Sequence, residues 1–336
     1  MRILAVRIGR AGDIIMTTPA LSAIFDNYPN AEVTVLTGPD GRRILKNFHS
    51  RLHEIWVWNR SSLHNLSDKR KIVKKLATHS FDIIFCFDTS NRIISIFKNT
   101  TAKFYQPISD NSQKHSSAIY LEIVEQDCGT LKKPYYAQLP VDNDASVAVN
   151  AELMEHGISP DDIVVMLHPS YSGYTSNPVK KFLNRKNRSL VHRLWNPENF
   201  SKLAELLASL KTKNGATPKV IIDLVPEEAP LGESILRSSH DTVTLLLVKP
   251  NFERYKALIK RADLLVVPNT GPMHIAAAVG TKIVALFSNW SPEDCGPYME
   301  PSLFKIIRAE EMPESEQGLN AIPPETVMTA CKELLD

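Results

Sequence analysis

Short apolar runs alternate along the whole chain with stretches in which apolar residues recur at helical spacing. Continuous apolar runs are typical of parallel strands that are buried on both faces. Alternation of such strands with helices predicts doubly wound α/β domains. In chain order the expected strands are 3–8, 32–36, 55–58, 81–87, 103–105, 163–167, 219–224, 242–248, 264–267 and 282–287.

The most regular of these units lies at 261–287. A strand at 264–267 leads into a Pro-Asn-Thr-Gly-Pro turn, an alanine-rich helix at 273–279 that Gly280 ends, and a second strand. The start of that helix carries unpaired N–H groups and the positive end of the helix dipole, and it follows the carboxyl end of a strand. Open α/β sheets bind ligands at that edge, so the sequence predicts an anion site here, most simply for a diphosphate.

The N-terminus has a similar strand-turn-helix order, with Asp13 on the turn and a helix expected over 14–25 that contains Pro19. Neither G-x-x-x-x-G-K-[ST] nor G-x-G-x-x-G occurs there, so the turn is not one of the familiar phosphate loops. A carboxylate in this position can accept a proton from a reacting hydroxyl. It can also simply cap the helix.

A proline-containing stretch without helical period, 131–144, separates two ranges of comparable length. We therefore expect an N-terminal domain at 1–140 and a C-terminal domain at 145–336. The D-x-D triplet Asp142-Asn143-Asp144 resembles a metal motif, but it falls in this linker and not at the end of a buried strand. We do not interpret it as a metal site.

The motif N-T-G-P-M-H-I-A-A-A-V-G-T-K-I-V-A-L-F at 269–287 resembles the D-[ST]-G-x-x-H-x-A-A-x-G-x-P-x-x-A-L-F signature of the ADP-heptose:lipopolysaccharide heptosyltransferases, glycosyltransferase family nine. Gly12, Asp13 and Pro19-Ala20-Leu21 fall in register with the opening of that family. His168-Pro169-Ser170 and the motif at 193–200 also resemble it. One position departs, because Asn269 stands where the family usually has an acid.

The resemblance implies the glycosyltransferase B-type fold, α/β with two doubly wound Rossmann-like domains facing across a cleft. It also implies transfer of a heptose from ADP-heptose to a lipopolysaccharide inner-core acceptor, with Asp13 as general base. The implied donor-binding residues are Ser170, Arg193, Glu228, Asn269, Thr270, Gly271, Pro272, Met273 and His274. The implied acceptor-binding residues are Gly12, Arg10, His115, Lys180, Lys181 and Arg185.

Several of these positions have a purely structural alternative. Asn269 and Thr270 can serve as helix caps, and His274 can be a packing histidine instead of a phosphate ligand. The polar segment 171–192, rich in Lys and Arg, is either a solvated insertion or a lid over an acidic acceptor. The basic amphipathic helix expected over 68–79 has a solvated face or meets an anionic membrane.

Composition narrows the range of compartments, partners and cofactors that we expect for this chain. Cys86, Cys128, Cys295 and Cys331 are widely spaced, which favours reduced thiols in the cytoplasm over disulfides or a metal site. No apolar run approaches the ~18–20 residues of a membrane span, so at most the protein rests on the inner-membrane surface. The net charge of +2 gives no indication of a nucleic-acid partner. We expect no required cofactor, although Mg²⁺ can accompany a nucleotide diphosphate.

Two other functions remain open at this point. A glycosyltransferase of the same fold with another nucleotide sugar would share all of these features. A non-catalytic nucleotide-sugar-binding protein would account for Asn269 in place of the acid, although it would have no need of Asp13.

Overall fold

The structure, a computed structural model, describes residues 1–60, 65–108, 114–170 and 194–336. The chain divides into two compact units, which are described separately. The first contains Met1–Pro140 together with Glu293–Tyr298, and the second contains Val141–Pro292 together with Met299–Asp336. The short segment Glu293–Tyr298 thus groups with the first unit, whereas the sequence placed it in the C-terminal domain.

The first unit is built on a parallel sheet in the order β3-β2-β1-β4-β5. Its central strand β1 pairs with β2 on one side and β4 on the other, and β1 and β4 are buried along almost their whole length. The strands are β1 (Arg2–Arg7), β2 (Glu32–Thr37), β3 (Leu52–Val57), β4 (Ile83–Cys86) and β5 (Lys103–Tyr105).

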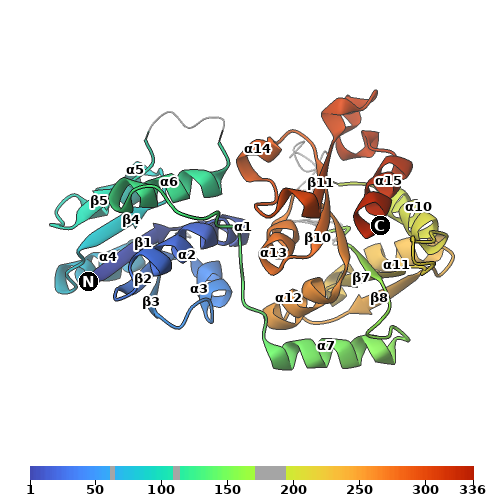
Figure 1. Ribbon diagram of the computed structural model, residues 1–336, viewed down its shortest axis with the longest axis horizontal. Helices are drawn as coiled ribbons and strands as arrows, with labels where there is room; N and C mark the ends of the chain where they lie inside the picture. The colour runs from blue at the N-terminus through green and yellow to red at the C-terminus, as the bar shows by residue number, and fades with distance from the viewer. Residues whose placement is uncertain (61–64, 109–113, 171–193) are drawn as a thin grey trace. The chain divides into compact units, whose positions relative to one another are not determined.

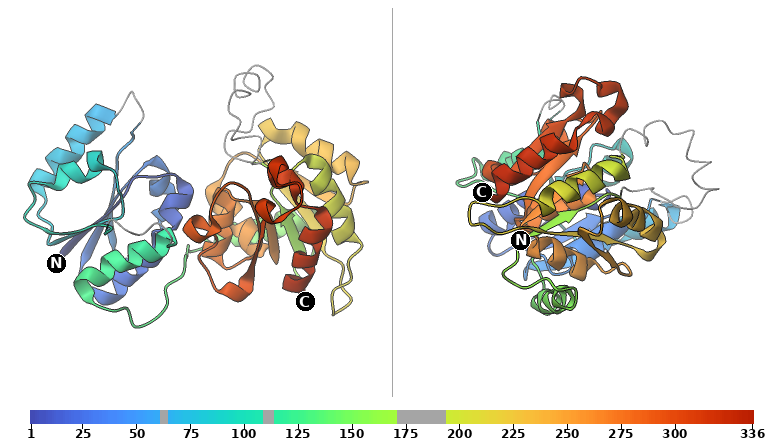
Figure 2. Two further views of the ribbon diagram at one scale, coloured as in Figure 1. Left: turned by 90° about the horizontal axis from the view of Figure 1, so that it is seen from above. Right: turned by 90° about the vertical axis from the view of Figure 1, so that its right-hand side faces the viewer.

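Helices cover both faces of this sheet, as Figure 2 (left) shows, with α2 and α6 on one face and α4 and α5 on the other. A core of β1, β4, α4 and α5 side chains, including Leu4, Ile84, Ile72 and Phe97, fills the second interface. The helices are α1 (Ala11–Ile15), α2 (Thr18–Asn27), α3 (Pro39–Leu45), α4 (Asn65–Thr78), α5 (Asn91–Ile94), the 3-10 turn η1 (Ser95–Phe97) and α6 (Ser116–Cys128).

The second unit has a parallel sheet in the order β11-β10-β9-β6-β7-β8 (Figure 1). Its two middle strands, β9 and β6, are entirely apolar and buried, and so is β10 apart from Lys282, as the sequence pattern predicts for parallel strands covered on both faces. The strands are β6 (Val164–Leu167), β7 (Lys219–Leu224), β8 (Val243–Leu247), β9 (Leu264–Pro268), β10 (Lys282–Phe287) and β11 (Phe304–Arg308).

On one face of this sheet α10, α11 and α15 pack together, and on the other α12 packs against α7 and α13. The first face holds an apolar cluster in which Trp195 and Phe200 are fully buried. The helices are α7 (Asn143–Glu155), α10 (Pro197–Ala208), α11 (Ala229–Ser238), α12 (Phe252–Arg261), α13 (Gly271–Val279), α14 (Pro292–Cys295) and α15 (Pro324–Leu335). Short 3-10 turns are η2 (Pro226–Glu228), η3 (Pro301–Leu303), η4 (Ala309–Glu311) and η5 (Ser315–Ala321).

The prediction of an α/β fold with two doubly wound parallel sheets is confirmed, with two local corrections. The single helix expected over 14–25 is two helices, because Pro19 stands in the first turn of α2 and lacks the N–H that would continue α1. The D-x-D triplet is the start of α7, where the Asp142 carboxylate accepts a hydrogen bond from Ala145 N–H at 2.9 Å. That triplet is therefore a helix cap.

Candidate functional site

In the first unit, the strand order reverses direction between β1 and β4, and such a switch point is where open α/β sheets bind ligands. Asp13 lies there, on the short helix that follows β1. Its Oδ1 accepts a hydrogen bond from Arg7 Nη2 at 2.8 Å, and its Oδ2 accepts one from the Arg10 backbone N–H at 2.9 Å. The carboxylate remains about one-third exposed, so a ligand can reach it.

Asp13 is not the lone carboxylate that the sequence suggested. Arg7, the last residue of β1, also faces Asp88, which follows β4, with 3.8 Å between Arg7 Nη1 and Asp88 Oδ2. Asp88 is almost fully buried and accepts a hydrogen bond from the Ile8 N–H at 3.4 Å. One guanidinium therefore bridges two carboxylates at the switch point and fixes the orientation of Asp13. Sequence reasoning missed both Arg7 and Asp88: each stands at the end of an expected strand, but nothing in the sequence shows that these two strands are neighbours.

The turn before Asp13 has no room for a side chain at Gly9. A Cβ built on Gly9 would lie 2.5 Å from Asp13 Cβ and 2.6 Å from Asp13 Oδ2. The glycine thus allows the carboxylate to fold back against the strand end, next to Arg7 and the Arg10 N–H. Of the predicted acceptor-side residues, Gly12 and Arg10 both lie on this turn.

We expect Gly9→Ala to reduce turnover while leaving the fold intact. The new methyl group must push the Asp13 side chain away from Arg10 N–H, and a displacement of about 1 Å in a reacting group can cost ~10²-fold in rate. Steady-state kinetics and a melting curve on the same preparation measure both effects. Full activity in Gly9→Ala would show that the position of Asp13 against Gly9 has no bearing on the reaction.

A pocket of 520 Å³ adjoins this cluster. Its lining combines apolar side chains, such as Phe87 and Ile119, with polar ones that are uncharged apart from the Arg7 guanidinium, and this mixture suits a sugar with its hydroxyl groups and apolar ring face. Polar or aromatic residues of its lining are Arg7, Thr89, Asn91, Gln106, Ser116 and Tyr120.

His115 has both ring nitrogens engaged within the first unit. Nδ1 accepts a hydrogen bond from Ser117 N–H at 3.0 Å, and Nε2 lies 3.0 Å from the Gly296 carbonyl oxygen, to which it donates. The ring stacks on Tyr298 with 4.6 Å between centroids, and burial lowers its pKa. These contacts make His115 the anchor of the Glu293–Tyr298 segment. Its predicted contact with an acceptor stays a prediction.

The second unit has its own switch point between β6 and β9. Ser170, just after β6, is buried, and its hydroxyl donates a hydrogen bond to the Glu228 carboxylate at the end of η2, after β7. The structure therefore brings together two predicted donor-binding residues that lie far apart in the sequence. Glu227 belongs to the same 3-10 turn.

His168, the residue that follows β6, helps to fix the end of this strand. Its Nδ1 lies 3.1 Å from the Tyr255 hydroxyl, which extends from α12. Burial lowers the pKa of His168 to about 4, partly offset by a hydrogen bond to the Ser170 backbone. Burial also raises the pKa of Tyr255. Both side chains are thus neutral at pH 7, and they hold the backbone from which Ser170 projects.

This neutral, partly buried histidine gives a pH-dependence of stability. Its pKa is about 6.5 in the unfolded chain and about 4 in the folded one, so the unfolded state binds more protons between these values. The stabilisation is complete above pH 6.5 and is lost as the pH falls towards 4, by up to about 3 kcal/mol. Urea unfolding across this range measures it. His168→Gln should flatten the profile and the exposed His156→Gln should not, so equal profiles in both variants would contradict the assignment.

The start of α13 lies across the switch point from Ser170. Thr270 is its N-cap residue, but the Thr270 hydroxyl donates to the Pro268 carbonyl at 3.2 Å and makes no cap to the helix. Asn269 precedes the cap position. The capping alternative is therefore wrong for Thr270, whose side chain makes no cap hydrogen bond. For Asn269 it stays a prediction.

The geometry of this helix start suits an approaching anion. Among the residues that the structure describes, a Cβ at Gly271 would meet no atom within 4 Å, so these residues leave space beside the first turn. Pro272 stands in that turn without an N–H, while Met273 and His274 are buried against the sheet. The exposed part of the helix start is thus its backbone at Gly271, which matches the way helix N-termini bind phosphate groups.

Some predicted site residues lie outside the described part of the chain: Arg193, Lys180, Lys181 and Arg185. Among the described residues, no group of three or more His, Cys, Asp or Glu side chains is placed to hold a metal ion. Within those residues, too, no helix has the length and apolar character needed to cross a membrane.

A family model and a curated relative both indicate similarity to heptosyltransferases. The model of the family described as glycosyltransferase family 9 (heptosyltransferase) matches residues 174–319. Lipopolysaccharide heptosyltransferase 3 of Escherichia coli K12 is 22% identical over 350 residues, which cover 96% of this chain and 95% of the relative.

Two solved structures share the fold. A family 9 glycosyl transferase of Veillonella parvula superposes with a TM-score of 0.79 at 18% identity, over 99% of this chain and 97% of the other. The E. coli heptosyltransferase WaaC, solved with ADP, superposes with a TM-score of 0.70 at 15% identity, over 99% of this chain and all of the other.

Proposed function

We propose that this chain, whose residues 174–319 match the model of glycosyltransferase family 9, transfers a heptose from ADP-heptose to an inner-core sugar of lipopolysaccharide, with Asp13 as general base. The observation that carries the proposal is the position of Asp13 at the switch point of the first sheet, oriented by Arg7 and still open to a ligand. The relative that spans nearly the whole chain is named a lipopolysaccharide heptosyltransferase, which supports the proposal.

The donor is proposed to bind at the corresponding edge of the second sheet. There the start of α13, with open space at Gly271, lies across the switch point from Ser170 and Glu228. The helix N-terminus would receive the diphosphate, helped by Arg193, and Glu228 would face the nucleoside. WaaC, which has the same fold, was solved with ADP.

The chemistry follows from these two sites. The acceptor hydroxyl oxygen forms a bond to the anomeric carbon as the bond from that carbon to the ADP oxygen breaks. Asp13 takes the hydroxyl proton, and the negative charge that develops on the departing diphosphate is stabilised by the helix dipole and Arg193. Mg²⁺ would enter only as a companion of the diphosphate. The pocket beside Arg7 is where we propose that the acceptor sugar binds.

The reaction would take place on the cytoplasmic side of the inner membrane, where the acceptor is anchored by its lipid. A transferase with another nucleotide sugar is the alternative that shares this geometry. A non-catalytic binding protein is disfavoured by the pairing of Arg7 with Asp13, because a pure binding protein gains nothing from an oriented carboxylate at this edge.

The donor can be identified by the stabilisation that it confers. A ligand at 100 times its Kd stabilises the folded state by about 2.7 kcal/mol, so melting curves with ADP-heptose, UDP-sugars and GDP-sugars should separate the candidates. We expect a shift with ADP-heptose, and transfer of its sugar to a delipidated inner-core acceptor. A shift with a UDP- or GDP-sugar alone would favour the alternative donor. Donor binding without transfer to any core acceptor would favour the binding protein.

A further inference from the structure

The outer face of α4 carries exposed apolar side chains in line. Leu66 is 71% exposed and Val73 is 43% exposed, and Ala77 is exposed on the same side of the helix. Residues seven apart lie two turns apart on nearly the same line of an α-helix. The side of α4 that packs on the sheet, through the buried Ile72 and the partly buried Leu76, adjoins this stripe around the helix.

Three cations accompany this apolar stripe: Lys69, Arg70 and Lys74. In the described part of the chain none of them has an acidic group within ion-pair distance. The other two lysines of α4 are neutralised by ion pairs: Lys71 pairs with Asp68 at 3.2 Å, and Lys75 pairs with Glu54 at 3.4 Å. The face therefore combines exposed apolar side chains with positive charge that the protein does not itself neutralise.

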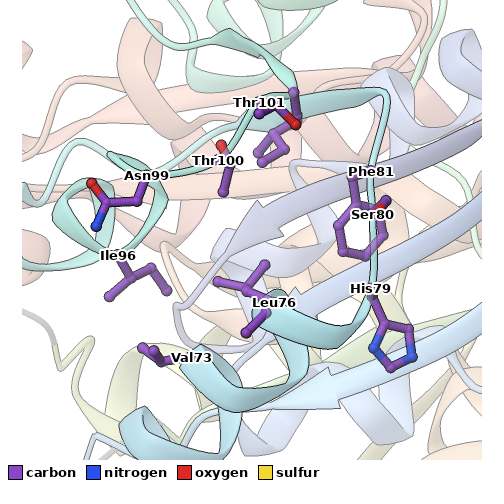
Figure 3. A pocket seen from close by; sticks show the side chains of 12 residues that line it. Val73, Leu76, His79, Ser80, Phe81, Ile96, Asn99, Thr100 and Thr101 are labelled. Carbon is purple, nitrogen blue, oxygen red and sulfur yellow. The ribbon is translucent and has the colours of Figure 1, made fainter.

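The apolar surface continues past the stripe. Val73 also lines a pocket of 390 Å³ between the last turns of α4 and residues 96–102, and Figure 3 shows Val73, Leu76, Phe81 and Ile96 around it. The pocket adjoins the amino-terminal ends of β4 and β5, whereas Asp13 lies at the carboxyl edge. It is thus separate from the candidate catalytic site.

We propose that this face of α4 docks onto an anionic phospholipid membrane, with Leu66 and Val73 in the interfacial layer and Lys69, Arg70 and Lys74 against lipid phosphates. Helices with an apolar stripe and flanking cations lie in the membrane interface in this way. The charge complementarity selects an anionic surface, because each Lys or Arg near such a surface adds roughly fivefold to binding. The proposal goes beyond the proposed function and does not depend on the chemistry at Asp13.

The orientation that docking imposes suits a lipid-anchored substrate. The start of α4 is tied to the carboxyl end of β3, since Trp58 Nε1 donates to Asn65 Oδ1 at 3.0 Å and Asn59 N–H to Asp68 at 3.1 Å. In a parallel sheet this is the edge that also carries Asp13. A membrane against α4 therefore lies beside the edge at which the acceptor would react.

The chain also provides a matched control. On α7, Val147 and Met154 are likewise exposed and seven residues apart, at 69% and 59%. That helix contains neither Lys nor Arg and ends in Glu155. It thus presents a comparable apolar stripe without the cations.

Co-sedimentation of the full-length protein with vesicles tests the proposal. We expect binding to phosphatidylcholine vesicles that contain phosphatidylglycerol, weaker binding in high salt, and little binding to phosphatidylcholine alone. The triple variant Lys69→Gln/Arg70→Gln/Lys74→Gln should lower the partition coefficient by about 100-fold. Leu66→Ser/Val73→Ser should also lower it. The controls Val147→Ser/Met154→Ser and Lys213→Gln/Lys249→Gln/Lys332→Gln should bind as the parent does.

Two results would overturn the proposal. The first is equal binding of the parent and the triple variant to anionic vesicles, with both proteins folded by melting curve. The second is loss of binding to a delipidated acceptor in the triple variant while vesicle binding is retained, which would assign the face to the acceptor sugar. Transfer to the delipidated acceptor should be unchanged in the α4 variants, so failure of membrane docking is distinguishable from failure of the proposed reaction.

Discussion

Asp13→Asn is expected to lower the rate of sugar transfer by about 10²–10⁴, the usual contribution of a general base. The amide has nearly the size of the carboxylate but cannot take a proton from the acceptor hydroxyl. Single-turnover kinetics with saturating donor measure this step directly. Donor affinity, measured by calorimetry, should stay within a few-fold of the parent value, because Asp13 lies in the first unit and the donor site is proposed in the second.

A matched variant separates this effect from a general loss of charge. Asp40 also stands in the first turn of a helix, α3, and its side chain is 40% exposed, but it pairs with Arg43 of its own helix at 3.0 Å. Asp40→Asn should therefore turn over normally. Equal turnover in Asp13→Asn and the parent would remove Asp13 from the role of base and leave it as a partner of Arg7.

Arg254→Met is expected to lower the free energy of unfolding by about 3–5 kcal/mol, as found when one partner of a buried ion pair is removed. Arg254 on α12 pairs with Glu152 of α7 at 2.6 Å and with Asp223 of β7 at 2.8 Å. Asp223 is buried, and burial raises its pKa despite the neighbouring guanidinium. Without Arg254, two carboxylates would face each other with no cation between them. Urea unfolding at pH 7 measures the loss.

Arg237→Met is the control for this change. Arg237 is 71% exposed and lies 3.8 Å from Glu233 on α11, so its pair is screened by solvent. Its loss should change stability by no more than about 0.5 kcal/mol. An Arg254→Met protein as stable as Arg237→Met would show that α7 is held to its unit by apolar packing alone.

The unit around α13 shows what the sequence can predict. The expected strands at 264–267 and 282–287 and the helix ended by Gly280 correspond closely to β9, β10 and α13. Fully apolar strands bounded by glycine and proline leave few alternatives, since the pattern, the turn residues and the helix stop all agree. Gly280 has a φ of 77°, the left-handed conformation that favours glycine at the end of a helix.

The candidate site was harder to predict from the sequence, because the order of the strands in each sheet brings its residues together. Arg7 and Asp88 are neighbours only because β4 pairs with β1, and Ser170 meets Glu228 only because β7 pairs with β6. Local patterns contain no information on strand order, so Asp13 could be singled out but not its partner. The predicted Thr270 cap was wrong for a different reason, which is local: the Thr270 hydroxyl donates its hydrogen bond to the Pro268 carbonyl and not to the helix.

The return of Glu293–Tyr298 to the first unit bears on how this enzyme can be recombined with its relatives. The chain crosses between the units after Pro140, after Pro292 and after Tyr298, so the first unit is made of two separate segments of the sequence. A chimaera joined only in the 131–142 linker would pair α6 with a foreign segment, and His115 would lose its partners Gly296 and Tyr298. Exchange of acceptor-side units among relatives therefore requires two grafts, one at the linker and one that carries 293–298 with it.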